Sequence, residues 1–255
     1  MGKKTITRNR LVRHLDEYLN VGTIIDDSLN GLQVEGAARV ARIALAVDAC
    51  QQTITAAVRA RAEILIVHHG LFWGRRERIT GVMQARIKRL LTHNISLYAA
   101  HLPLDCHREI GNNAELARLL GFDVTAPFAK YKGIDIGILA GTPRPVSRTG
   151  VVKRIERELD TTATVLPFGP TAVKRIGIVS GGGDFAVGEA LQHGCDTFIT
   201  GETSHVAFHF AKEGKMNIIY AGHYASETVG LKALGRHLGD RYGVACTFLS
   251  APTGF

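Results

Sequence analysis

Long apolar runs and paired cysteines are both missing from this chain. No stretch reaches the roughly 18 apolar residues that predict a membrane-spanning helix, and the basic start MGKKTITRNRL lacks the apolar region of a signal peptide. The cysteines, Cys50, Cys106, Cys195 and Cys246, are widely spread and form no CxxC pair. We therefore expect free thiols in a reducing compartment, hence a cytoplasmic protein without membrane contact.

The usual signatures of nucleotide and nucleic-acid binding are also missing. The chain contains neither GxxxxGK[ST] nor a proper GxGxxG, and it has no zinc-finger spacing and no aromatic RNA-binding segment. Its formal net charge of +8 nevertheless favours anionic partners. The basic residues are scattered, and the nearest thing to a cluster is Arg75, Arg76 and Arg78, with Lys88 and Arg89 nearby. Nucleic-acid binding is therefore a weakly indicated alternative.

The pattern that is present is an alternation of short apolar runs with helical spacing. The chain has 255 residues, of which 45% are hydrophobic and 21% charged, so it can bury a core in one large domain or two ordinary ones. The alternation predicts an α/β protein with mainly parallel sheets. The expected strands are 42–47, 64–67, 96–100, 134–140 and 163–167, and the expected helices are 51–61, 84–92, 112–120 and 148–159.

The last third of the chain repeats the first. Arg42 and Arg175 each open a predicted strand, and the strand–helix–strand pattern that follows keeps the same register, so that His68-His69 aligns with Gly201-Glu202. The repeated unit predicts two related α/β lobes that face a shared crevice, with the strand ends lining it. We place the first lobe at 1–126 and the second at 127–255, although the C-terminal helix can pack on the first.

Two adjacent histidines, His68 and His69, end the apolar run ILIV. Neighbouring side chains in a strand point to opposite faces, so a solvated strand end is the simpler interpretation of this pair. Beyond the strand, however, the backbone can turn at Gly70 and direct both rings to one place.

Two further pairs follow strands and are related by the repeat. His101-x-x-x-Asp105 aligns with His223-x-x-x-Glu227. Pro103 opposes a regular helix in the first pair, whereas a helix starting at His223 would put the second pair on one face. A turn or a helix cap is the alternative in each case.

Together the three strand ends supply four imidazoles and two carboxylates. This is too many for one catalytic zinc ion, which keeps three protein ligands, and it suits two ions with bridging carboxylates. The mixed nitrogen and oxygen donors favour Zn, Mn, Fe, Co or Ni over Ca or Mg. The predicted metal ligands of this dinuclear site are His68, His69, His101, Asp105, His223 and Glu227.

At these residues the chain resembles the NIF-three-like proteins, also labelled GTP cyclohydrolase 1 type 2 homologues. The resemblance implies two α/β lobes around a dinuclear metal centre with the same six ligands, and assembly into toroidal homohexamers. The short middle stretch leaves no room for the domain that some members insert. The matching segments are DDSLNGLQVEG (26–36), ILIVHHGLFWG (64–74), YAAHLPLDCHREIGNNAELARLLG (98–121), GIVSGGG (177–183), DTFITGE (196–202) and AGHYASETVG (221–230).

Two functions are consistent with this interpretation. The first is a dinuclear metal-dependent hydrolase of a nucleotide-like or phosphate-bearing small molecule, such as a GTP cyclohydrolase-like enzyme, with Glu202 as general base and His205 orienting a carboxylate. A structural turn is the alternative for Glu202. The second function is a ring-shaped metal-binding scaffold that engages nucleic acid or a protein partner.

Several other polar segments carry weaker signals. The Ser180–Gly183 loop could offer backbone N–H groups to phosphate, but a tight turn is the favoured interpretation. Asp27, Ser28 and Asn30 suggest a polar loop entering the crevice, with an Asx turn as the alternative. We leave Cys106 and His107 out of the site. Surface or core positions are expected for His14, His93, His193, His209 and His237.

Overall fold

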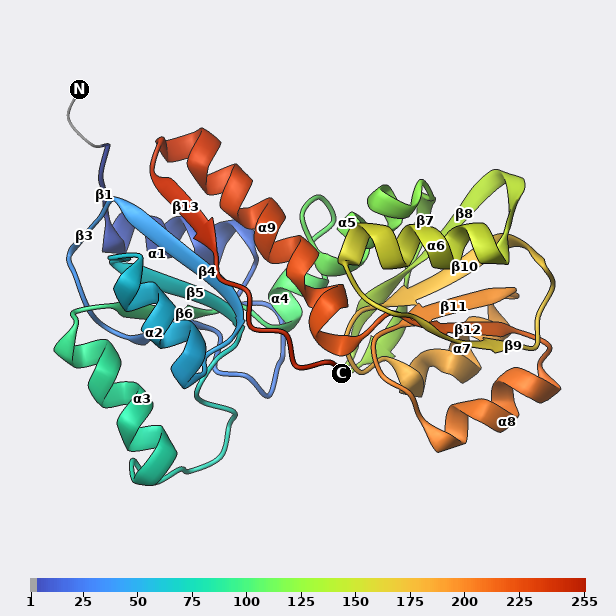
Figure 1. Cartoon of the computed structure of the whole chain (residues 1–255), viewed down its shortest axis with the longest axis horizontal. Coiled ribbons are helices and arrows are strands. Elements are labelled where there is room, and N and C mark those ends of the chain that lie inside the picture. The colour runs from blue at the N-terminus through green and yellow to red at the C-terminus, as the bar shows by residue number, and fades with distance from the viewer. Residues whose placement is uncertain (1–3) are drawn as a thin grey trace. The chain divides into compact units, whose positions relative to one another are not determined.

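The computed structural model describes residues 4–255, which form two units that are considered separately. The first unit comprises the described residues up to Leu104 together with Leu231–Ala251, and the second comprises Asp105–Gly230 and Pro252–Phe255. These units divide the chain elsewhere than the boundary placed at 126 from the sequence. The long helix α9 (His223–Tyr242) begins in the second unit and ends in the first (Figure 1).

A five-stranded sheet forms the centre of the first unit, in the order β13-β4-β5-β6-β2. Neighbouring strands are parallel except for β2, which pairs antiparallel with β6 at one edge. A small antiparallel pair, β1 with β3, lies apart from this sheet. The strand bounds are β1 Ile6–Thr7, β2 Gly31–Val34, β3 Arg39–Val40, β4 Arg42–Asp48, β5 Ile64–His69, β6 Ser96–Ala99 and β13 Ala245–Phe248.

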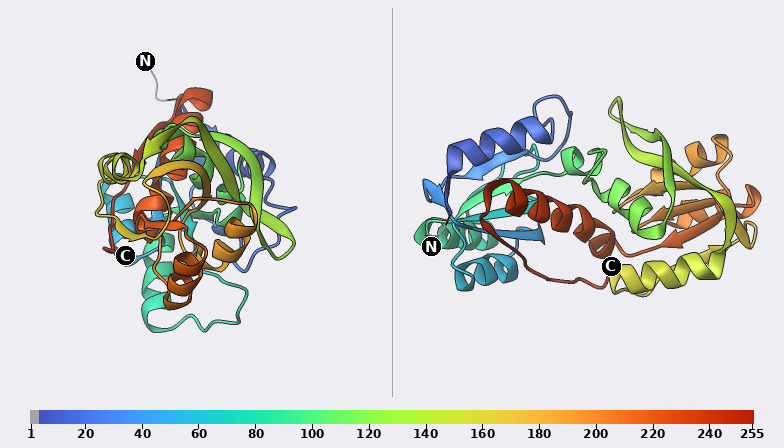
Figure 2. Two further views of the ribbon diagram at one scale, coloured as in Figure 1. Left: turned by 90° about the vertical axis from the view of Figure 1, so that its right-hand side faces the viewer. Right: turned by 90° about the horizontal axis from the view of Figure 1, so that it is seen from above.

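Helices cover both faces of this sheet because the strands are apolar on both. Ile54 of α2 (Gln51–Arg59) and Leu90 of α3 (Gly81–Thr92) pack on one face. Helix α1 (Arg8–Tyr18) lies on the opposite side of the sheet from α2 (Figure 2). Buried strands without polar alternation are what a two-sided parallel sheet requires.

The second unit contains a six-stranded sheet in the order β7-β8-β10-β11-β12-β9. Only β10, β11 and β12 are mutually parallel, and antiparallel strands flank them on both sides, so this sheet is mixed rather than mainly parallel. Helices α5 (Asn112–Leu120) and α6 (Arg148–Leu159) share one apolar core with the sheet. The remaining bounds are β7 Asp123–Tyr131, β8 Ile134–Ser147, β9 Thr164–Pro167, β10 Ala172–Val179, β11 Thr197–Thr200, β12 Asn217–Tyr220, α7 Val187–Gln192 and α8 His205–Glu213.

The internal repeat predicted from the sequence is present in the structure as β4-α2-β5-α3-β6 and β10-α7-β11-α8-β12. Even a polar detail recurs. In each repeat, a carboxylate just before the second strand (β5 or β11) accepts hydrogen bonds from two consecutive backbone N–H groups. These groups lie at or near the start of the first strand (β4 or β10). Glu63 accepts from Ala41 and Arg42, and Asp196 accepts from Lys174 and Arg175. The two units therefore begin their parallel strands in the same way.

One local expectation was wrong. Pro103 does not prevent a helix after His101, because α4 spans Leu102–Asp105 and Pro103 lies in its first turn. A backbone N–H has no intrahelical partner there, so proline costs nothing. Separately, no helix among residues 4–255 combines the length and apolar character needed to cross a membrane.

The repeated carboxylate gives a test of this fold. We expect Asp196→Ala to lower the free energy of unfolding by about 1–3 kcal/mol, because the N–H groups of Lys174 and Arg175 lose their acceptor. Urea unfolding followed by circular dichroism measures the effect. Asp123→Ala, at an exposed position in β7, is the control and should change stability by less than about 0.5 kcal/mol. Equal effects in the two variants would contradict the assigned role.

Candidate metal centre

The three histidines of the first unit come together at the carboxyl ends of β5 and β6. Each of His68, His69 and His101 offers one ring nitrogen, and these atoms lie within 4.8 Å of one another. His68 is fully buried, and both His68 and His69 follow the last register pair between β5 and β6, Val67 with Ala99. Adjacent residues thus reach a common place, because both lie where pairing to β6 has ended.

The Nδ1 atom of each ring is held by a protein acceptor. His68 Nδ1 lies 2.9 Å from the carbonyl oxygen of Ala100, and His69 Nδ1 lies 2.9 Å from Asp48 Oδ1. Since carbonyl and carboxylate oxygens only accept hydrogen bonds, Nδ1 must carry the proton, and the neutral ring keeps its lone pair on Nε2. Hydrogen bonds of this kind orient metal-binding histidines in proteins.

His101 is oriented in the same way by a loop that precedes β2. Its Nδ1 lies 3.0 Å from Asp26 Oδ1, and its backbone N–H donates to Asn30 Oδ1 at 2.8 Å. Asp26 also accepts from Asn30 Nδ2 at 2.8 Å and from the N–H groups of Ser28 and Leu102. Burial alone would raise the pKa of Asp26, but the hydrogen bonds from His101, Asn30 and Ser28 outweigh it and hold the pKa well below its usual value.

In the second unit, His223 and Glu227 occupy the first turn of α9 on one face, as the spacing predicted. His223 Nε2 lies 3.1 Å from Glu227 Oε1, and His223 Nδ1 donates to Glu202 Oε1 at 2.6 Å. Glu227 is 3% exposed. Burial alone would lower the pKa of His223, but the Glu227 and Glu202 carboxylates raise it to about 9. His223 is thus the fourth imidazole with Nδ1 committed to an acceptor.

Asp105 is fixed by a buried amide network in the same unit. Its Oδ1 accepts from Asn112 Nδ2 at 2.8 Å and from Ser180 Oγ at 3.0 Å. Asn112 Oδ1 in turn accepts from Gly230 N in α9 at 3.0 Å. The carboxylate of Asp105 and the helix that carries His223 and Glu227 are therefore positioned by one asparagine.

The chain is similar in sequence to a protein family and to several proteins of that family. A sequence profile of the family Duf34/NIF3 (NGG1p interacting factor 3) matches residues 6–253. A Deinococcus radiodurans protein named GTP cyclohydrolase 1 type 2 homolog is 42% identical over 253 residues, covering 99% of this chain and 96% of its own. A protein of the same name from Archaeoglobus fulgidus is 44% identical over 243 residues, covering 95% and 97%.

This chain belongs to the Duf34/NIF3 family.

Solved structures agree with the assignment. A structure titled protein ybgI, of unknown function, superposes with a TM-score of 0.92 at 36% identity and covers 98% of this chain and 100% of its own. The protein TTHA1606 from Thermus thermophilus gives a TM-score of 0.87 at 40% identity with the same coverage. The α/β fold of this Duf34/NIF3 protein is therefore that of its relatives.

The Ser180–Gly183 loop of this Duf34/NIF3 protein is a tight turn and not an open phosphate cradle. The N–H groups of Ser180, Gly181 and Gly183 donate to Asn113, Ser226 and Thr200, respectively. Gly181 has φ +63°, and a Cβ there would lie 2.2 Å from Glu227 Oε1. The favoured sequence interpretation was therefore correct, and the glycine leaves space for a candidate metal ligand.

Sequence reasoning missed Asp26 and Asp48, the two acceptors behind His101 and His69. The residues predicted from this loop are Asp27, Ser28 and Asn30. Of these, Asn30 and the backbone of Ser28 donate hydrogen bonds to Asp26. Only the neighbouring DD dipeptide could have indicated Asp26.

Other candidate residues have local roles. His107 Nδ1 accepts from the N–H groups of Glu109 and Ile110 and so stabilises a turn. His205 begins α8 with its ring centroid 6.1 Å from that of His209, and its predicted contact with a carboxylate stays a prediction. His14 and His237 pair through their Nε2 atoms at 2.9 Å.

The acceptor pattern predicts the effect of Asp26→Asn on metal affinity. Asparagine can still accept from His101 but lacks the charge that makes the ring a stronger donor to metal, so we expect affinity to fall roughly 10–100-fold. Trp73, the single tryptophan, lies 5.0 Å from the His101 ring centroid and 5.8 Å from that of His69. Quenching of its fluorescence by Co²⁺ measures the affinity. Asp240→Asn, at an exposed position in α9, is the control, and an equal loss there would contradict the role of Asp26.

Proposed function

We propose that this protein is a metal-dependent hydrolase whose six candidate ligands bind two divalent transition metal ions per chain. The observation that carries the proposal is that all four candidate imidazoles have Nδ1 committed to a protein acceptor. Imidazoles held this way present Nε2, which matches the needs of Zn, Mn, Fe, Co or Ni. Asp105 and Glu227 add carboxylate oxygens of low exposure, 8% and 3%.

The donor set fits such ions in charge as well as in atom type. Two carboxylates against two divalent ions leave about two net positive charges, which favours an anionic substrate. When bound, ions of this kind lower the pKa of a coordinated water towards 7 and polarise the bond under attack. The protein's contribution is to fix the donors before the metal arrives.

Glu202 has two roles in this proposal, one in orienting His223 and one as a general base. Its Oε1 orients His223, while the carboxylate is half-exposed and lines an open cavity. A carboxylate in this position can take a proton from an attacking water, which is the general-base role assigned from the sequence. The proposed substrate is nucleotide-like or phosphate-bearing, in line with the relatives named GTP cyclohydrolase 1 type 2 homolog.

Metal analysis combined with a substrate panel tests the proposal. Protein prepared with Mn²⁺ should contain two ions per chain and hydrolyse at least one member of a panel of nucleotides and phosphate esters. Chelation or His68→Ala should abolish turnover and lower the metal content, whereas His93→Ala, at an exposed helix end, should change neither. Wild-type protein that holds no transition metal would contradict the proposal.

Glu202→Gln separates the two roles of the glutamate. The glutamine amide oxygen can still accept from His223 Nδ1 but cannot take a proton. We therefore expect unchanged metal content and a turnover that falls roughly 10²–10⁴-fold. Glu202→Ala should lose metal affinity as well. Full activity in the glutamine variant would leave Glu202 only a positioning role.

A scaffold that binds nucleic acid is the alternative function, and one observation favours it. Arg75, Arg76 and Arg78 are exposed, and the salt bridges among residues 4–255 do not include them. Binding through them would weaken steeply as salt rises. No DNA affinity at physiological salt, or an affinity independent of salt, would remove this alternative. The same preparations measured by light scattering test the homohexamer that we propose as the assembly.

A further inference from the structure

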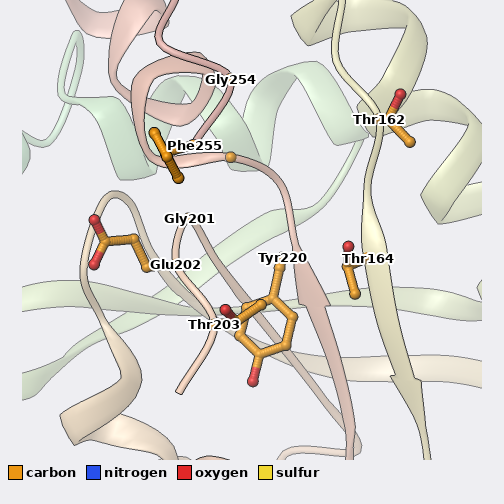
Figure 3. A pocket seen from close by; sticks show the side chains of 9 residues that line it. Thr162, Thr164, Gly201, Glu202, Thr203, Tyr220, Gly254 and Phe255 are labelled. Atoms are coloured by element: carbon orange, nitrogen blue, oxygen red, sulfur yellow. The ribbon is translucent and has the colours of Figure 1, made fainter. Parts of the chain in front are cut away.

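A cavity of about 350 Å³ lies beside Glu202 in the second unit. Figure 3 shows Glu202 and Phe255 on one side of it, Thr162 and Thr164 on the other, and Tyr220 near its base. This volume is at the lower end of the range for small-molecule sites, so the cavity holds a single ring system with a substituent rather than a large ligand.

The charge of the lining excludes a phosphate here. Glu202 is the only charged side chain among the lining residues, and neither lysine nor arginine is one of them. Inside the cavity a phosphate would meet this like charge, because His223, which balances Glu202 from behind, is not one of the lining residues. The part of a substrate that enters this cavity is therefore uncharged or a hydrogen-bond donor, and an anionic part must lie elsewhere.

The side chains that remain offer aromatic surface and hydroxyl groups. Tyr220 is 4% exposed and Phe255 is 79% exposed, so the first is a fixed part of the wall and the second leaves a ring face open to a ligand. Thr162 and Thr164 are exposed at the β9 edge, and no interaction of their hydroxyls occurs within the described chain. Stacking together with hydroxyl groups at the rim suits a flat ring that carries both donors and acceptors.

Glycines also line the cavity, and they expose the backbone there because they have no side chain. Gly222 has φ +87°, and a Cβ there would lie 3.3 Å from Thr161 Oγ1 and 3.4 Å from the carbonyl oxygen of Phe255. At Gly201 a Cβ would lie 2.7 Å from the Gly181 carbonyl oxygen. Larger residues would narrow the cavity or distort its rim, so the glycines give a flat ring close access to backbone.

We propose that this cavity binds the uncharged nitrogen-heterocyclic ring of the substrate, stacked on Phe255 and hydrogen-bonded by Thr164. The assignment rests on the proposed function, because it identifies the cavity as the substrate's ring subsite next to Glu202. It also predicts that the phosphate-bearing part of the substrate contributes nothing to binding inside the cavity.

Ligand-observed NMR tests the assignment on the full chain, loaded with Zn²⁺ in place of Mn²⁺. The three probes are inosine, ribose and ribose 5-phosphate. Inosine should bind saturably, and the two probes that lack the ring should not compete with it. Phe255→Ala should weaken inosine binding roughly fivefold or more, and Thr164→Val roughly threefold or more. Phe185→Ala, which removes a 46% exposed phenylalanine outside the cavity, and Thr142→Val are the matched controls and should bind inosine as the wild type does.

Three results would overturn the assignment: no inosine binding, equal binding of ribose 5-phosphate, or equal weakening in the control variants. Metal content and hydrolysis are measured on the same preparations. Inosine binding without any hydrolysis would support the ring subsite while removing the hydrolase. Hydrolysis that persists when inosine does not bind would overturn the subsite alone.

Discussion

The hydrogen bond at Nδ1 of each candidate imidazole is the interaction on which the account of this protein depends. An imidazole with both nitrogens uncommitted can rotate or exchange tautomers. With Nδ1 donated to Asp48, Asp26, Glu202 or the Ala100 carbonyl, only one nitrogen can serve an ion. The same bond makes the ring a stronger donor when its acceptor is a carboxylate.

The repeated α/β unit explains how the chain builds these acceptors. In both units a parallel strand ends where a neighbouring strand supplies a histidine, His101 after β6 and His223 after β12. At the equivalent ends of β5 and β11 the repeats differ, with His69 in one and Glu202 near the other. The first unit therefore supplies two additional rings, His68 and His69, and the second supplies the carboxylate that orients its histidine. A duplicated fold has acquired different chemistry at matched positions.

Periodicity and the repeat were sufficient to predict the parallel strands of the two repeated units, most of their helices and the residue types at the strand ends, but not the parallel edge strand β13 or helix α8. They were not sufficient for the acceptors, because Asp26 lies 75 residues from His101 and Asp48 lies 21 residues from His69 along the chain. Contacts of that separation depend on tertiary packing. The antiparallel pair β7–β8 of the second sheet was missed for a different reason, since β7 was not predicted as a strand and β8 runs on past its predicted end to Ser147.

The tight turn at Ser180–Gly183 is a second case in which the local sequence pattern does not determine the role of a segment. A glycine run after a strand resembles a phosphate loop in sequence, but its N–H groups are used by Asn113, Ser226 and Thr200. What the glycines provide is space beside Glu227, which no local pattern reveals.

Anomalous diffraction from metal-loaded crystals, recorded at the absorption edge of the metal, shows which ring nitrogens hold the ions. We expect peaks about 2.0–2.1 Å from Nε2 of His68, His69, His101 and His223, with each Nδ1 still bonded to its present acceptor. A metal on Nδ1 of any of these rings, or metal peaks remote from all four, would contradict this expectation.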